Sequence, residues 1–170
     1  MESNEEEKES ISIDQNKLSI RVAITAITAS LYITLGYIFQ PISFYGIQFR
    51  VAELMVGMCI IFPWEGLIGK VIGVFFVNLT SPLGPIDLIS VFVNIPALYC
   101  IVLLRNMKLL KYLGGIIYSA IISLYVATVL NFAFGLPIPL SFIQVLISEV
   151  VLSILGILLF NIVKYRMFQI

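Results

Sequence analysis

Residues 50–80 read RVAELMVGMCIIFPWEGLIGKVIGVFFVNLT, and this stretch decides the fold. Two apolar segments, Arg50–Phe62 and Glu65–Thr80, flank a turn at Pro63 and Trp64, because proline cannot continue a helix. As helices of about 13 and 16 residues they would rise about 20 and 24 Å, against about 30 Å for the hydrocarbon core of a bilayer. The sequence therefore predicts two helices that fall short of one face of a membrane.

The rest of the chain agrees with a membrane environment. Of its 170 residues, 60% are hydrophobic and only 12% are charged, with a mean hydropathy of +1.06. Proline, glycine and charged residues separate four further apolar segments, Ser19–Gln40, Ile86–Leu104, Leu113–Phe134 and Ser141–Lys164. We therefore predict an all-α fold, a six-helix transmembrane bundle over residues 18–170 that forms one multi-pass domain in the cell membrane.

The charged residues predict how the chain is oriented. Most Lys and Arg residues fall at the two ends of the chain and in the connection Arg105–Lys111, whereas Gly135–Leu140 carries no charge. Because basic residues favour the cytoplasmic side, both termini are expected in the cytoplasm. Residues 1–17 hold six acids and are expected to form a solvated, disordered tail.

The composition argues against an enzyme. The sequence contains no histidine, which excludes histidine-based triads and imidazole metal sites, and Cys59 and Cys100 lie inside apolar runs where a thiol is an ordinary small hydrophobic group. No paired carboxylates with metal spacing and no nucleophile with a matching base occur. We expect no catalytic residues, no cofactor and no metal, and there is no basic patch for nucleic acid.

Polar residues cluster at the level where the two short helices end. Irregular backbone at membrane depth must border protein or a watery cavity, so the segments Pro41–Phe49 and Thr80–Pro85 are expected to roof an outward-facing cavity. Intramembrane charges cost roughly 2.5–3.5 kcal/mol each and usually bind a ligand or pair with one another. The candidate substrate-binding residues are Gln48, Arg50, Glu53, Asn78, Asp87, Asn94, Asn131 and Glu149.

Two alternatives stay open for these charges. Arg50, Glu53 and Asp87 would also be explained if they neutralised one another and held helices in register, with Arg50 engaging Glu53. Glu149 has no cation within a helical turn, which favours a ligand contact. Glu65 and Lys70 are interpreted as anchors at the inner membrane interface, Lys70 by extending its side chain toward it.

Small residues mark one face of the first segment. Ala23, Ala26, Ala29 and Ser30 recur at helical spacing. Such spacing lets a second helix approach closely within lipid, so these residues are candidates for docking a partner subunit. Packing inside the protein is the alternative explanation.

Several stretches resemble the queuosine-precursor transporter family, QueT. They are AITASLY at residues 26–32, QPISF at 40–44, GIQFRVAE at 46–53, FPW at 62–64 and NLTSPLG at 78–84, followed by Asp87. The resemblance is dense over residues 23–87 and mostly hydropathic from there to Lys164.

The resemblance implies a substrate-binding S-component of an energy-coupling factor (ECF) importer. Such a subunit would capture queuine or a related 7-deazaguanine from outside and would work with a transmembrane coupling subunit and two ATPase subunits. The chain has no GxxxxGK[ST] motif, so ATP hydrolysis would occur in the partners. An S-component for another vitamin-like molecule, or a non-catalytic membrane assembly subunit, is the alternative.

Overall fold

The protein is entirely helical over the part that the structure describes. This computed structural model describes residues 2–44 and 48–167, with side chains described for residues 17–43 and 48–166. Seven α-helices and two 3-10 segments follow one another in the order α1 (Glu2–Ile38), α2 (Gln40–Phe44), η1 (Val51–Gly57), α3 (Met58–Ile61), α4 (Pro63–Asn78), η2 (Gly84–Ile89), α5 (Ser90–Leu104), α6 (Leu110–Phe134) and α7 (Ile138–Met167).

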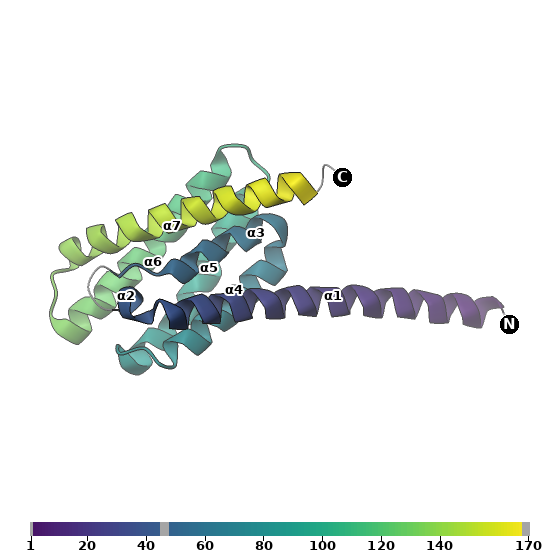
Figure 1. Ribbon diagram of the computed structural model, residues 1–170, viewed down its shortest axis with the longest axis horizontal. Helices are drawn as coiled ribbons and strands as arrows, with labels where there is room; N and C mark the ends of the chain where they lie inside the picture. The colour runs from purple at the N-terminus through teal and green to yellow at the C-terminus, as the bar shows by residue number, and fades with distance from the viewer. Residues whose placement is uncertain (1, 45–47, 168–170) are drawn as a thin grey trace.

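These elements confirm the predicted helical segments. Pro63 opens α4, and Gly135 ends α6 with a left-handed φ of 68°, which glycine adopts without strain. The second predicted segment divides into η1 and α3, and the fourth divides into η2 and α5. Helix α1 continues as helix through residues 2–17 and its first part projects beyond the bundle (Figure 1). The proposed division between a tail at residues 1–17 and a membrane domain stays a prediction.

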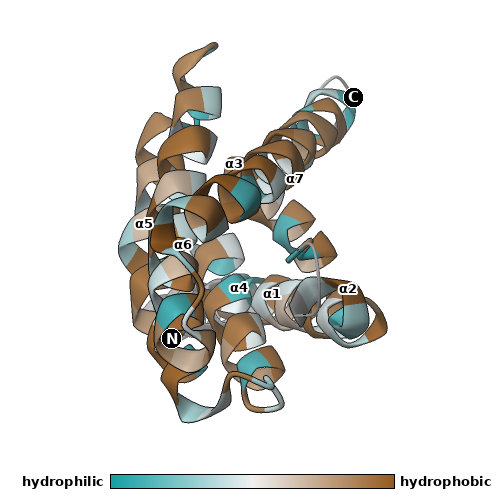
Figure 2. Cartoon of the chain, turned by 90° about the vertical axis from the view of Figure 1, so that its left-hand side faces the viewer, coloured by the Kyte–Doolittle hydropathy of each residue, from teal (hydrophilic) through white to brown (hydrophobic). Residues whose placement is uncertain are grey.

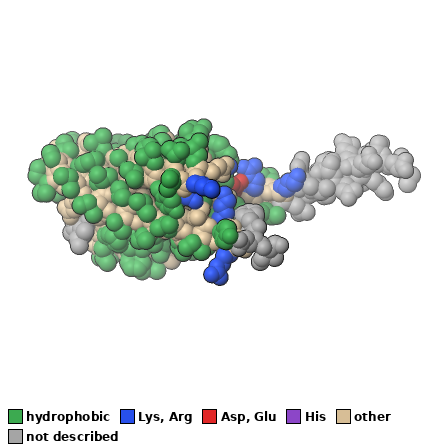
Figure 3. Space-filling view, turned by 90° about the horizontal axis from the view of Figure 1, so that it is seen from above, with side chains coloured by type: hydrophobic (Ala, Val, Ile, Leu, Met, Phe, Trp, Pro, Cys, Tyr) green, Lys and Arg blue, Asp and Glu red, His purple; other side chains and the backbone are tan. Residues whose placement is uncertain are grey.

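Within the part of the chain that the structure describes, four stretches are long and apolar enough to cross a membrane. They are Lys17–Ile38, Gly84–Leu104, Leu110–Phe134 and Ile138–Arg166. The segment Val51–Ile61 and the 16-residue helix α4 are shorter, as predicted. Hydrophobic residues dominate α5, α6 and α7 in Figure 2, with single hydrophilic residues between them. Most of the molecular face seen in Figure 3 is likewise covered by hydrophobic side chains, which is the surface that a lipid environment requires.

The helices pack as neighbouring pairs. Helix α1 lies along α4, α6 lies between α5 and α7, and α7 crosses η1 (Figure 1). The start of α1 and the end of α7 lie toward the same end of the bundle. Lys and Arg side chains gather at this end too (Figure 3), and we call it the basic end. The core includes Val56, Leu98, Ile101 and Tyr118, none of which has exposed surface.

The crossing of η1 and α7 depends on glycine. A Cβ atom built on Gly156 would lie 2.3 Å from the backbone oxygen of Leu54, and one built on Gly57 would lie 2.1 Å from the backbone oxygen of Gly156. The two backbones are therefore in direct contact, which is a common use of small residues between helices in lipid.

Gly156→Ala should destabilise the protein by about 1–3 kcal/mol, because the added methyl group overlaps backbone atoms that cannot rotate away. Thermal unfolding in detergent measures the effect as a lower Tm. Gly114→Ala is the matched control, since its nearest neighbouring atom would lie at 3.2 Å. Equal Tm values for the two variants would show that η1 and α7 do not pack this closely.

Candidate functional site

A fully buried ion pair lies in the middle of the bundle. Lys70 Nζ lies 2.8 Å from Glu53 Oε2, and the two side chains are 0% and 2% exposed. Tyr32 donates its hydroxyl hydrogen to Glu53 Oε1 at 2.8 Å. Tyr118 donates to Glu53 Oε2 at 2.5 Å, and Lys70 also donates to Asn94 Oδ1 at 3.1 Å. We call these five residues the Glu53–Lys70 network.

The network connects five elements. Tyr32 comes from α1, Glu53 from η1, Lys70 from α4, Asn94 from α5 and Tyr118 from α6. Charged groups in a low-dielectric interior require a partner and hydrogen bonds to their remaining atoms, and this arrangement supplies both. The network therefore fixes the relative positions of these elements.

This geometry corrects two sequence-based interpretations. Lys70 was expected to extend toward the inner interface, but it lies about 10 Å along α4 from Pro63 and points into the bundle. Glu53 was expected to engage Arg50, but Lys70 holds it instead. Glu65 does lie at the basic end, where Arg21 Nε donates to its Oε1 at 2.5 Å.

Two other carboxylates are buried without such partners. Asp87 in η2 and Glu149 in α7 are both 0% exposed. Within the described part of the chain, none of their four oxygens has a hydrogen-bond partner. Buried polar atoms in native proteins nearly always have one, so these two groups call for an explanation.

Arg50 links these carboxylates to the rest of the site. It is 7% exposed, and its positive charge is attracted by the carboxylates of Asp87 and Glu149. The charge of Glu149 interacts in turn with those of Glu53, Arg50 and Lys70. The structure thus brings Arg50, Glu53, Asp87 and Glu149 into one electrostatic cluster, next to the Glu53–Lys70 network.

The other predicted site residues have varied positions. Gln48 is buried and has a left-handed φ of 56°, a strained backbone for a residue other than glycine that often occurs at binding sites. Asn94 belongs to the Glu53–Lys70 network.

Asn78 donates to the Asp87 backbone oxygen at 3.0 Å and to Ser90 Oγ at 2.6 Å, which joins α4 to η2. Asn131 is exposed and donates to the Leu136 backbone oxygen at 2.8 Å, where it supports the turn after α6.

The two segments predicted to roof the cluster are linked at one point. Gln40 Nε2 donates to the Thr80 backbone oxygen at 3.1 Å, which joins the start of α2 to the segment after α4. Residues 45–47 of the first roofing segment lie outside the described residues. Apart from Asn131, the side chains expected to line an open cavity are buried by the surrounding protein instead.

Sequence reasoning did not select Lys70, Tyr32 or Tyr118 for the site. The available signal was an acid and a base, Glu53 and Lys70, in the interiors of two consecutive apolar segments. Charges of opposite sign at membrane depth are expected to pair. A tyrosine inside an apolar helix, such as Tyr118, also needs a partner for its hydroxyl group once it is buried.

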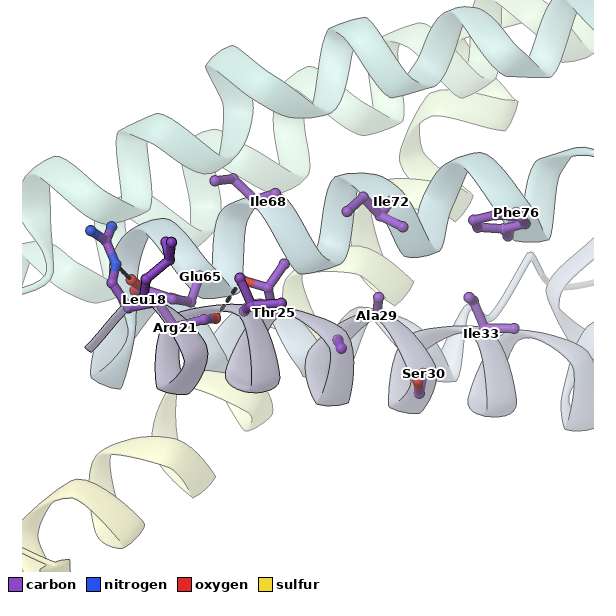
Figure 4. A pocket seen from close by; sticks show the side chains of 12 residues that line it. Leu18, Arg21, Thr25, Ala29, Ser30, Ile33, Glu65, Ile68, Ile72 and Phe76 are labelled. Carbon is purple, nitrogen blue, oxygen red and sulfur yellow. Dashed lines mark hydrogen bonds and ion pairs between the residues drawn. The ribbon is translucent and has the colours of Figure 1, made fainter. Parts of the chain in front are cut away.

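A groove of about 700 Å³ runs between α1 and α4 on the outer surface of the bundle (Figure 4). Three of the four candidate docking residues, Ala26, Ala29 and Ser30, line it, and Ala23 does not. Ala29 is only 6% exposed, so internal packing accounts for part of its role, whereas Ala26 is exposed. No group of three His, Cys, Asp or Glu residues that could hold a metal ion occurs among the described residues.

Lys70→Met should destabilise the protein by about 3–5 kcal/mol, because it leaves Glu53 as an uncompensated buried charge. The double variant Glu53→Gln/Lys70→Met should recover part of this loss, since it removes both charges. Thermal unfolding in detergent compares the unaltered chain, the single variants Lys70→Met and Glu53→Gln, and the double variant. A double variant whose loss equals the sum of the two single losses would refute the pairing.

Comparison with known proteins identifies the family. Residues 22–165 match the family model described as QueT transporter. No curated protein and no solved structure matches the chain. The matched region includes all four long apolar stretches almost completely, together with the buried cluster between them. This chain is a multi-pass membrane protein that belongs to the QueT transporter family.

Proposed function

We propose that this chain is the substrate-capturing S-component of an ECF importer and that it binds a queuosine precursor such as queuine. Membership of a transporter family supports the general role. The resemblance described above supplies the substrate class and the ECF partners. The buried cluster around Glu149 supplies a site of matching chemistry.

In this proposal the chain crosses the membrane six times. Chain ends that lie at the same end of the bundle require an even number of crossings, and η1 with α3, followed by α4, adds two to the four long stretches. The basic residues at that end favour the cytoplasm. In this orientation the buried cluster of Arg50, Asp87 and Glu149 lies toward the outer side of the membrane.

The observation that carries the proposal is that the carboxylates of Asp87 and Glu149 are buried without hydrogen bonds. Burial without hydrogen bonds is costly for a carboxylate, so a bound partner that donates hydrogen bonds would offset that cost. A guanine-like base offers an N1–H and an exocyclic amine side by side. A single carboxylate can accept both in a charge-assisted bidentate contact, which is strong and geometrically selective.

Glu149 is the better candidate of the two for this contact. It lies about 16 Å along α7 from Ile138, near the middle of the membrane. Asp87 lies in a 3-10 segment, its charge interacts with that of Arg50, and in this proposal it contacts another edge of the ligand. Because both groups are buried, the ligand enters only when the covering segments separate, and the Gln40–Thr80 hydrogen bond is one contact that must break.

Glu149→Gln should weaken queuine binding by about 2–5 kcal/mol, because the new amide presents a donor to the ligand's own donors. Titration calorimetry with the purified protein measures the Kd. Glu65→Gln is the matched control, since it makes the same change in a carboxylate at the basic end and should leave the Kd unchanged. An unchanged Kd for a folded Glu149→Gln protein would move the assignment to Glu53 and Asp87. Absence of queuine binding by the unaltered chain would favour another vitamin-like ligand or an assembly role.

The coupling subunit is proposed to dock on the groove between α1 and α4. Small side chains along α1 leave this groove open to a helix from a partner, and the groove walls are mostly apolar away from the Arg21–Glu65 ion pair at one end, as a contact within lipid requires (Figure 4). Ala26 lies in the groove and is exposed, so it is the residue at which bulk would interfere most directly.

Ala26→Trp should abolish assembly with the coupling and ATPase subunits while leaving the Kd for queuine nearly unchanged. Co-purification of the complex measures assembly, and calorimetry measures binding. Ile27→Trp is the control, because Ile27 is 56% exposed and does not line the groove. Loss of ligand affinity together with assembly would assign Ala26 to internal packing.

A further inference from the structure

A second concave site lies at the basic end. It is a pocket of about 420 Å³ between the α5–α6 connection and the last turns of α7. Four cationic side chains line it, from Arg105, Lys108, Lys111 and Lys164, together with Asn161 and Tyr165. No acidic side chain is among its lining residues.

Neutral groups hold the two central lysines in place. Lys111 Nζ donates to Asn161 Oδ1 at 2.6 Å, and Lys164 Nζ donates to the Ile60 backbone oxygen at 3.4 Å. Like charges so placed repel each other, and an anion bound between them would relieve this repulsion.

The acids of the described chain do not neutralise this pocket. Glu53 pairs with Lys70 and Glu65 pairs with Arg21, while Asp87 and Glu149 belong to the buried cluster. The positive charge of the pocket is thus uncompensated by any described carboxylate. A pocket of convergent cations is a more specific feature than the scattered basic residues that orientation alone requires.

The surroundings of the pocket indicate what kind of anion would bind. Leu109 is 81% exposed, and Leu110 and Leu113, on the first turn of α6, are 43% and 45% exposed. Tyr165, which is 65% exposed, has the amphipathic ring that favours the level of lipid headgroups. An anion with acyl chains attached would place its charge in the pocket and its chains along these leucines. Free phosphate would fill the pocket but would leave the leucines uncovered.

We propose that this pocket binds the phosphate of an anionic phospholipid headgroup, with the acyl chains against the start of α6. Basic pockets between helices at a membrane surface bind such headgroups in other membrane proteins. The lipid would connect the α5–α6 connection to α7. This site lies apart from the substrate cluster and does not depend on the ligand or on the partner subunits.

The test compares lipids added to the purified full-length chain in neutral detergent. Phosphatidylglycerol should raise the Tm and stay bound in native mass spectrometry, whereas phosphatidylcholine and inorganic phosphate at the same concentration should do neither. Lys111→Gln should weaken retention of phosphatidylglycerol about fivefold, since each basic residue near a membrane surface contributes on that scale. The new amide can still donate to Asn161, so folding should be kept, and Lys164→Gln provides an independent second variant.

Lys17→Gln is the matched control, because Lys17 is an exposed base near the same end and does not line this pocket. It should retain phosphatidylglycerol as well as the unaltered chain does. If Lys17→Gln and Lys111→Gln lost phosphatidylglycerol retention equally, general surface charge would explain the binding and the proposed site would be overturned. If inorganic phosphate raised the Tm as much as phosphatidylglycerol does, a free phosphate would be sufficient and the lipid would be overturned as the ligand of this pocket. Equal retention of phosphatidylcholine would mean that the net negative charge of the headgroup is not recognised, and would also overturn the proposal.

Discussion

The buried ion pair between Glu53 and Lys70 is the interaction on which the rest of the bundle depends. Two charges within a lipid-surrounded interior are costly unless each finds its partner and its remaining hydrogen bonds. Here Tyr32, Asn94 and Tyr118 complete the arrangement from three other helices. Hydrophobic packing alone gives little orientation within a membrane, because lipid tails are as apolar as the helix surfaces. The polar network therefore selects one arrangement of α1, η1, α4, α5 and α6 among the many that apolar contacts would allow.

The two 3-10 segments follow from the same constraint. Both η1 and η2 are longer than the three or four residues usual for such segments, and each carries a buried acid, Glu53 or Asp87. A 3-10 segment rises about 2.0 Å per residue, so it stretches a short piece of chain further across the membrane than an α-helix does. It also changes the direction in which successive side chains point. The left-handed backbone at Gln48, two residues before Arg50, adds further local strain on the same side of the molecule. Irregular backbone is thus concentrated where the carboxylates lie.

Much of the fold was predictable because its signals are local. Pro63 and Gly135 end helices through their own backbone chemistry, and apolar length alone identifies the four long stretches and the shortness of α4. The partners of the buried charges were less predictable, because pairing depends on how helices rotate about their axes. Lys70 was placed at an interface because its side chain is long enough to extend, yet a carboxylate in the adjacent segment offered a nearer partner. Asn131 was assigned to the site because it ends an apolar segment on the same side as the other polar residues. Its amide instead donates a hydrogen bond to the turn that follows α6.

The four described carboxylates divide into two kinds, and we propose that the division separates structural charges from ligand-binding ones. Glu53 and Glu65 each have a cation within hydrogen-bond distance, so their contribution to the fold is complete in the chain itself. Asp87 and Glu149 are fully buried but have no hydrogen bond to their oxygens in the described chain, although the charge of Arg50 attracts both. A protein that merely needed neutral packing at these positions would be more stable with apolar side chains of similar size. Keeping two costly groups there is reasonable if a molecule outside the chain supplies the missing donors, which a transported base with adjacent N–H groups would do.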